Sequence, residues 1–253
     1  MALPQGCGTD DSASKSITAR ARDSYITGMD ELLSGNYTEA VLRFQEVAKN
    51  PGYVKYAALA RLRIGDALFL QEKYDAAIEL FRSFLKQYEG NPNTGYARFR
   101  IGHAYYARIP SDWFLAPPSY EREQTQILNA ERSLRRFVEL YPAHSLVPPA
   151  RKMLDDCKHR MYEHEMYVVG FYRDRKKPAA VVHRMEGAFR RFPRFAGTEK
   201  NYLTLAQAYA QTNAVAEATA MYQAYLKRFP SGAYRGQAEE SLRVLGSVKA
   251  DKG

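Results

Sequence analysis

A stretch of ten residues occurs twice in this chain, and the two copies begin 37 residues apart. The copies, ARLRIGDALF at 60–69 and ARFRIGHAYY at 97–106, agree at six of ten positions, and Gly28, Gly65 and Gly102 continue the spacing. A fixed period of this length is the signature of a protein that stacks copies of one small structural unit. The repeat therefore limits the possible folds more than any other feature of the sequence.

A second spacing describes the inside of each unit. Small residues recur in pairs 12 residues apart: Gly28 and Ala40, Gly65 and Ala77, and Ala206 and Ala218. This spacing predicts two helices joined by a short turn that approach closely where the side chains are small. Aromatic-proline steps in LYPAHS, RFPRFAG and RFPSGAY are expected to end second helices, because proline cannot continue a helix.

These patterns predict an all-α protein and resemble tetratricopeptide repeats, whose helical hairpins stack into a right-handed superhelix (an α-solenoid) with a concave inner face. The predicted hairpins cover 21–51, 58–92, 95–142, 148–193 and 199–230, and a capping helix is expected near 235–246. In the third unit, Ala130 follows Ala77 by 53 residues, so 16 extra residues enlarge a loop at 109–127. Its Trp113 and Phe114 are expected either to face the groove or a partner, or to plug a seam between repeats.

Composition excludes several classes of protein. Hydrophobic residues at 45% and charged residues at 26% are typical of a folded globular chain. We find no phosphate-binding glycine loop, nucleophile elbow or paired metal-ligand spacing, so neither an enzyme nor a cofactor is expected. Asp155, His159 and Glu163 share one helix face and could hold a metal, but the same spacing also gives ordinary surface ion pairs.

The net charge of +9 is concentrated, because residues 151–200 carry 13 basic and 7 acidic groups. Such a face can attract an acidic partner, or it can be a solvated helix face. Residues 173–194, with eight basic and two acidic groups, leave open a nucleic-acid-associated scaffold. Few aromatic residues lie among these cations, so nucleic acid is not the expected partner.

The concave face of such a superhelix is formed by the first helix of each hairpin. Residues three and four apart on these helices are expected to form an aromatic trough for an extended or amphipathic peptide. The alternative is that several of them pack between hairpins. The candidate peptide-binding residues are Tyr25, Met29, Leu62, Asp66, Phe69, Phe99, His103 and Tyr106.

Three strings in the sequence, YPAHS, YEHEMYVVGFY and AAVVHRMEG, closely resemble the BamD family of outer-membrane assembly lipoproteins, also called ComL-like or YfiO-like. The resemblance covers about residues 17–230. It implies a non-enzymatic, lipid-anchored protein on the periplasmic face of the outer membrane, within a complex that contains other assembly lipoproteins. It also implies that the N-terminal repeats bind unfolded β-barrel precursors and that the C-terminal repeats dock the periplasmic (POTRA) domains of the barrel-bearing subunit.

The resemblance suggests roles for individual residues. Cys7, preceded by Gly6, matches the acylated cysteine of a lipobox, with the first six residues an artificial start or a truncated signal; the alternative is an adventitious surface cysteine. Arg184 falls on the arginine of the family motif. With the basic excess around it, the expected docking set is Arg184, Glu186, Arg173, Arg175, Lys176 and Lys177.

The expected organisation is a tether at 1–16, substrate-binding repeats at 17–142 and docking repeats at 143–253. The alternative is a different periplasmic repeat scaffold, for instance one of envelope or pilus assembly.

Overall fold

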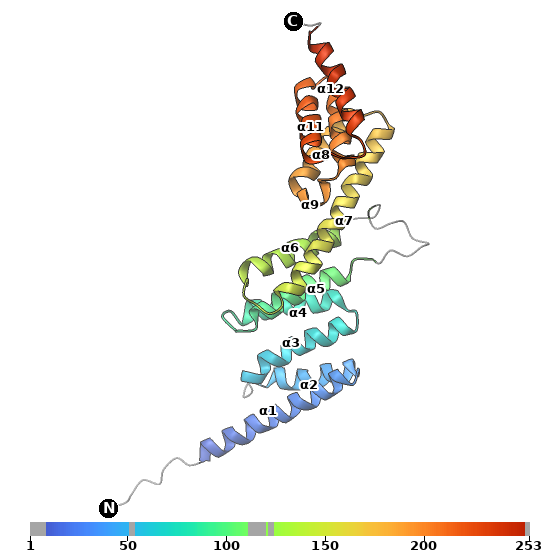
Figure 1. Cartoon of the computed structure of the whole chain (residues 1–253). Helices are drawn as coiled ribbons and strands as arrows, with labels where there is room; N and C mark the ends of the chain where they lie inside the picture. Colours follow the sequence, from blue (N-terminus) through green and yellow to red (C-terminus); the bar gives the residue numbers. More distant parts are fainter. Residues whose placement is uncertain (1–8, 51–53, 111–119, 121–123, 251–253) are drawn as a thin grey trace, which may run out of the picture. The chain divides into compact units, whose positions relative to one another are not determined.

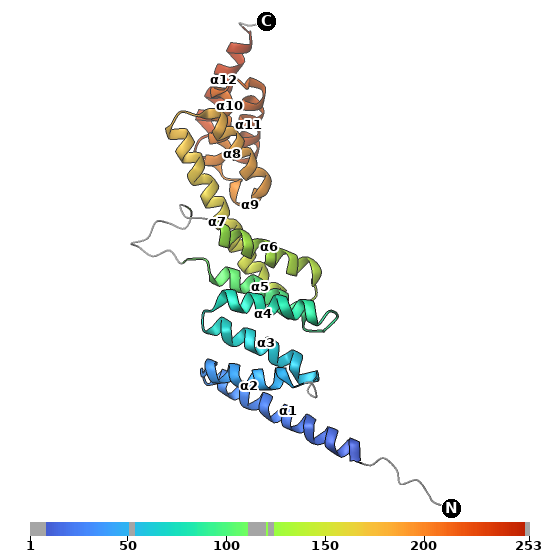
Figure 2. The same cartoon turned by 180° about the vertical axis from the view of Figure 1, so that it is seen from behind.

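The computed structural model describes residues 9–50, 54–110, 120 and 124–250, and within this part all regular secondary structure is helical. The helices occur in the predicted pairs and order (Figures 1 and 2). The bounds are α1 (Thr9–Leu33), α2 (Tyr37–Lys49), α3 (Val54–Leu70), α4 (Tyr74–Gln87), α5 (Thr94–Ala107), α6 (Thr125–Leu140), α7 (Val147–Asp174), α8 (Pro178–Arg191), α9 (Pro193–Ala196), α10 (Glu199–Gln211), α11 (Val215–Arg228) and α12 (Arg235–Ala250).

The sequence did not predict α9. The Phe192-Pro193 step was expected only to end a helix, and it does follow the end of α8. It also starts a new helical turn, because proline is favoured at the first helical position, where no backbone N–H is needed.

The short turns inside four hairpins share one backbone conformation. Gly35, Glu72, Lys176 and Asn213 all have positive φ, between 53° and 83°. Glu72 follows Gly35 by 37 residues and Asn213 follows Lys176 by the same interval, so the repeat extends to backbone geometry. Only glycine adopts this conformation without cost, and the hairpin contacts maintain it at the other three positions.

The chain divides into two compact units, and the division falls inside α7. Of the described residues, unit 1 contains 9–50, 54–110 and 125–155, and unit 2 contains 120, 124 and 156–250. The sequence placed the boundary at 142/143 instead. The difference arises because the first part of α7 contributes Val147, Ala150 and Leu154 to the core formed by α5 and α6.

In unit 1 each hairpin is closed by a large side chain that fills the space over a glycine. A Cβ atom on Gly28 would lie 2.8 Å from the ring of Phe44, and one on Gly102 would lie 2.8 Å from Leu134. The sequence paired Gly28 with Ala40 and Gly65 with Ala77, each 12 residues later. The structure corrects this for Gly28, because the three atoms nearest to its Cβ position all belong to Phe44 rather than to Ala40.

Gly28 and Phe44 are 16 residues apart, and unit 2 contains two pairs with the same spacing: Val169 with Met185, and Ala206 with Tyr222. Val169 and Met185 lie in one buried cluster with residues of α10, and Ala206 and Tyr222 lie in the next cluster with residues of α12. Met185 and Ala206 are fully buried. The fourth hairpin therefore has valine and the flexible methionine at the two positions where the first hairpin has glycine and phenylalanine.

Candidate binding surfaces

Unit 1 contains a polar cluster around Asp66, which is buried on α3. Arg63 donates to the Asp66 carboxylate at 2.7 Å, and Arg100 Nε lies 2.9 Å from its other oxygen. The Tyr96 hydroxyl also donates to this carboxylate at 2.7 Å, and Arg63 Nε donates to the Tyr25 hydroxyl at 3.2 Å. Two guanidinium groups around one carboxylate give this cluster a net positive charge.

An aromatic group adjoins this cluster. The rings of Phe69 and His103 lie 4.7 Å apart, those of Phe99 and His103 lie 5.5 Å apart, and the Arg100 guanidinium lies 4.2 Å over the Phe69 ring. Burial, reinforced by the charge of Arg100, lowers the pKa of His103 to about 4. His103 is therefore neutral at pH 7, as its packing between two apolar rings requires.

The predicted peptide-binding residues fall into two groups. Tyr25, Met29, Phe69, His103 and Tyr106 are partly buried and retain accessible surface. Leu62, Asp66 and Phe99 are only 2%, 5% and 5% exposed, so the hydrophobic core and the Asp66 cluster use these side chains. These three residues therefore fit the alternative interpretation, in which the side chains pack between hairpins rather than line a peptide-binding trough.

Sequence reasoning missed Arg63, Tyr96 and Arg100, although the repeat contained a signal for two of them. Arg63 and Arg100 are equivalent positions of the repeated Arg-Ile-Gly string, and Asp66 is equivalent to His103. Two arginines at equivalent positions on the first helices of adjacent hairpins indicate that both bind one acidic side chain. That side chain, Asp66, was instead predicted to line the peptide-binding trough.

In unit 2, Arg184 is held by an acidic residue of its own chain. Its guanidinium lies 3.3 Å from one carboxylate oxygen of Glu165 on α7, and Arg191 lies 2.9 Å from the other. Glu165 is buried, whereas the side chains of Arg184 and Arg191 are 40% and 49% exposed. The pair crosses from α8 to α7, and the second arginine leaves a net positive charge at the surface.

Glu186, also in the expected docking set, accepts a hydrogen bond of 2.7 Å from the Tyr209 hydroxyl. Burial together with this carboxylate raises the pKa of Tyr209 to about 12. Glu186 thus links α8 to α10.

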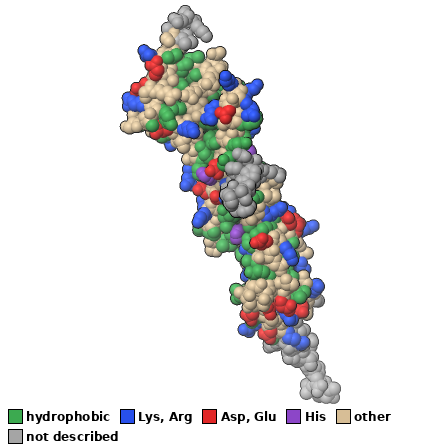
Figure 3. Space-filling view, turned by 90° about the vertical axis from the view of Figure 1, so that its right-hand side faces the viewer, with side chains coloured by type: hydrophobic (Ala, Val, Ile, Leu, Met, Phe, Trp, Pro, Cys, Tyr) green, Lys and Arg blue, Asp and Glu red, His purple; other side chains and the backbone are tan. Residues whose placement is uncertain are grey.

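The remaining cations of the docking set surround the turn between α7 and α8. Arg173, Arg175, Lys176 and Lys177 are exposed. Arg173 contacts Asp174 at 3.4 Å, and Arg175 lies 3.5 Å over the ring of Phe171. Figure 3 shows Lys and Arg side chains beside hydrophobic surface on unit 2.

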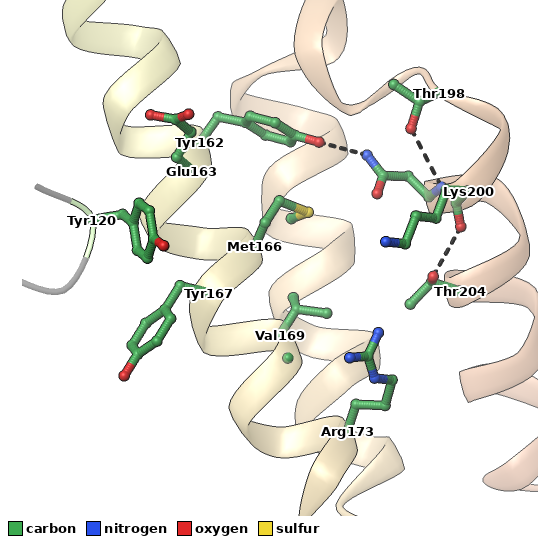
Figure 4. A pocket seen from close by; sticks show the side chains of 12 residues that line it. Tyr120, Tyr162, Glu163, Met166, Tyr167, Val169, Arg173, Thr198, Lys200 and Thr204 are labelled. Carbon is green, nitrogen blue, oxygen red and sulfur yellow. Dashed lines mark hydrogen bonds between the residues drawn. The ribbon is translucent and has the colours of Figure 1, made fainter. Parts of the chain in front are cut away.

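A cavity of about 490 Å³ lies between α7 and α10, within unit 2 (Figure 4). Tyr162, Met166 and Val169 are among its α7 residues, and Lys200 and Thr204 are among its α10 residues. The Tyr162 hydroxyl accepts a hydrogen bond of 2.8 Å from Asn201, which is buried beside the cavity. Thr198 caps the start of α10, which forms one side of the cavity, and this cap holds the first turn of the helix in place.

Cys7, Trp113 and Phe114 lie outside the described residues. In the part of the chain that the structure describes, no three His, Cys, Asp or Glu side chains form a group that could hold a metal. His159 instead contacts Glu163 at 3.7 Å, and its ring packs against Phe195. None of the described helices combines the length and the apolar character needed to cross a bilayer.

Stacked helical hairpins with partly exposed aromatic and cationic surfaces define a helical-repeat binding scaffold. Sequence comparison identifies the family: the chain belongs to the YfiO family of outer membrane lipoproteins, whose profile matches residues 18–223. This match confirms the resemblance that the three strings indicated.

Two relatives are named outer membrane protein assembly factor BamD. The Caulobacter vibrioides protein is 27% identical over 185 residues, which cover 73% of this chain and 58% of that protein. The Haemophilus influenzae protein is 27% identical over 213 residues, covering 82% and 79%. Both are named as assembly factors rather than as enzymes. Among solved structures, the TPR2AB domain of yeast Sti1 aligns over 92% of this chain and 86% of its own, with a TM-score of 0.47 and 13% identity.

Proposed function

We propose that this protein is a lipoprotein subunit of the β-barrel assembly machinery, which binds unfolded outer-membrane protein precursors and docks the POTRA domains of the barrel-bearing subunit. The observation that carries the proposal is the family match over residues 18–223, which extends through both units. The repeat architecture supports it, because stacked hairpins offer separate surfaces to separate partners.

For precursor binding we assign unit 1. Phe69, His103 and Tyr106 provide partly exposed aromatic surface, and the Asp66 cluster beside them has a net positive charge. A peptide ending in an aromatic residue fits this chemistry, since its ring can stack and its carboxylate meets two arginines. In a fluorescence titration, Tyr106→Ala should weaken binding of such a peptide, whereas Tyr105→Ala on the same helix is the matched control.

For docking we assign unit 2, with Arg184 and the cations of the α7–α8 turn. Surface plasmon resonance with the barrel subunit's purified POTRA domains tests this role directly. Saturable binding that weakens with salt supports docking, because exposed charges are screened. No binding at low salt, with the chain helical by circular dichroism, rejects it and leaves a different envelope scaffold.

For the lipid anchor we assign Cys7. When the chain is expressed behind a complete lipoprotein signal in a Gram-negative host, it should fractionate with membranes, and Cys7→Ser should release it. The matched control is Cys157→Ser at a buried position, which should leave fractionation unchanged. If the Cys7→Ser variant remained associated with membranes, Cys7 would not be the anchored residue.

A further inference from the structure

A second, smaller cavity lies next to the cavity between α7 and α10. The second has a volume of about 90 Å³ and reaches the α7–α8 turn. Arg173 and Thr204 line both cavities, so the two lie side by side along α7 and α10, inside unit 2. We call the two cavities together the α7–α10 groove.

The two ends of this groove differ in chemistry. The wider end has aromatic and apolar walls that include Tyr162, Met166 and Tyr167, and Figure 4 shows Tyr162 and Met166 directed toward α10. Glu163 and Lys200 line this end as well and carry opposite charges, and Arg173, which lines both cavities, adds one positive charge. The wider end therefore combines aromatic and apolar walls with a small positive excess.

The narrow end is cationic. Its lining includes Arg173, Lys176 and Lys177, the amides of Gln207 and Gln211, and no carboxylate. Asp174 contacts Arg173 at 3.4 Å, but neither Lys176 nor Lys177 has an ion pair within the described part of the chain. Two unpaired ammonium groups and two amides beside a small cavity attract carboxylates.

We propose that the α7–α10 groove binds an extended acidic peptide segment of a protein partner, with one bulky apolar side chain in the wide end and carboxylates at the narrow end. The proposal deepens the docking role that the proposed function gives to unit 2, and it rests on that role for the identity of the partner. Charge complementarity selects the occupant, because a basic or neutral segment would leave Lys176 and Lys177 without partners.

The geometry also sets the spacing in such a peptide. Tyr162 and Arg173 are eleven residues apart on one helix, a distance of about 16 Å at a rise of about 1.5 Å per residue. An extended chain covers this distance in about five residues. The bound segment therefore has its apolar side chain about five residues from its acidic group.

The test is a fluorescence-anisotropy titration of the whole chain with a labelled synthetic peptide, blocked at both ends, that carries a phenylalanine about five residues before a run of aspartates. We expect saturable binding, and about tenfold weaker binding when the aspartates are replaced by asparagines or the phenylalanine by alanine. Lys177→Glu should weaken binding by about the same factor, since it replaces attraction by repulsion. Tyr167→Ala, at a side chain that is 42% exposed, should weaken it without affecting folding.

The matched control is Lys227→Glu, the same charge change at an exposed lysine of α11 that does not line the groove. It should change the affinity less than about twofold. Equal losses in Lys177→Glu and Lys227→Glu would overturn the proposal in favour of nonspecific attraction. Failure to bind the aspartate peptide would also overturn it, and so would displacement of the peptide by inorganic phosphate or by vesicles of anionic phospholipid.

Binding of the POTRA domains is measured separately with the same variants. If the aspartate peptide binds as expected and the POTRA domains do not bind, the groove proposal is supported and the docking role is rejected. If the POTRA domains bind and the peptide does not, the docking role is supported and the groove proposal is rejected.

Discussion

The ring of Phe81 occupies the space that a side chain on Gly65 would need. A Cβ atom built on Gly65 would lie 2.7 Å from two ring carbons of Phe81, closer than such atoms approach in real structures. Gly65 is in α3 and Phe81 is in α4, so this contact sets how closely the two helices of the second hairpin approach. The glycine of the repeated Arg-Ile-Gly string is thus required by packing.

We expect Gly65→Ala to lower the free energy of unfolding by about 1–3 kcal/mol, because the added methyl group overpacks the hairpin. Urea unfolding followed by circular dichroism measures this. Gly187→Ala is the control, since nothing lies within 4 Å of a Cβ atom there. It should stabilise α8 by up to about 1 kcal/mol, as alanine is the better helix former. Equal effects at the two glycines would show that the Phe81 contact is unimportant.

The Asp66 cluster gives a second prediction about stability. Asp66→Asn leaves Arg63 and Arg100 without their shared anion, and the side chain of Arg100 is only 13% exposed. We expect a loss of about 2–4 kcal/mol in the free energy of unfolding. Asp75→Asn removes a carboxylate that is 78% exposed and pairs with Arg108, so it should cost less than about 0.5 kcal/mol. A loss at Asp66 no larger than that at Asp75 would mean that the cluster adds nothing to stability.

The lowered pKa of His103 predicts a dependence of stability on pH. Below pH 6.5 the unfolded chain takes up a proton on this imidazole, whereas the folded chain does so only near pH 4. The free energy of unfolding should therefore fall as the pH decreases from 6.5 to 4, and His103 should contribute its full stabilisation above pH 6.5. Because the side chain is only partly buried, we expect this contribution to be about 1–2 kcal/mol.

Unfolding of the parent and of His103→Gln across this pH range checks the prediction, since the other titrating groups are common to both. The difference between the two proteins should shrink as the pH falls. A difference that stays constant from pH 6.5 to 4, or an NMR titration of His103 with its midpoint near 6.5, would contradict it.

The periodic elements of this fold were predictable from the sequence because they depend on local signals. The Gly28, Gly65 and Gly102 series and the aromatic-proline steps located five hairpins and a capping helix, all of which the structure contains. The side chain that packs against each glycine was harder to predict. It depends on which side chain of the second helix contacts the glycine of the first helix, and both Ala40 and Phe44 are compatible with the 37-residue period.

The candidate sites were harder to predict because they depend on contacts between helices. Charge counting found the basic segment around Lys177 but could not show that Arg184 has a partner, Glu165, which lies 19 residues earlier on another helix. The α7–α10 groove joins side chains about 40 residues apart, such as Tyr162 and Asn201. No local sequence pattern indicates that two such residues are in contact, so the groove could be found only in the folded structure.

The ion pair between Arg184 and Glu165 changes how the docking role of Arg184 should be tested. A glutamate at position 184 would face the buried carboxylate of Glu165 and would destabilise the fold as well as any interface. Arg184→Gln removes the charge and leaves Arg191 to neutralise Glu165. We expect it to weaken binding of the POTRA domains by about 1.5–3 kcal/mol, mainly through faster dissociation, because an arginine that pairs across an interface slows separation.

Arg191→Gln is the matched control for this prediction. It also leaves Glu165 with a single guanidinium group, and it changes a side chain of similar exposure on the same helix. If Arg184 contacts the partner, Arg191→Gln should retain nearly the parent affinity. Lys177→Gln at the adjacent turn should slow association and reduce its salt dependence, since this exposed charge attracts an acidic partner at long range. Equal losses in Arg184→Gln and Arg191→Gln would assign the effect to Glu165 and the packing of α7 on α8, and docking would then depend on another surface of unit 2.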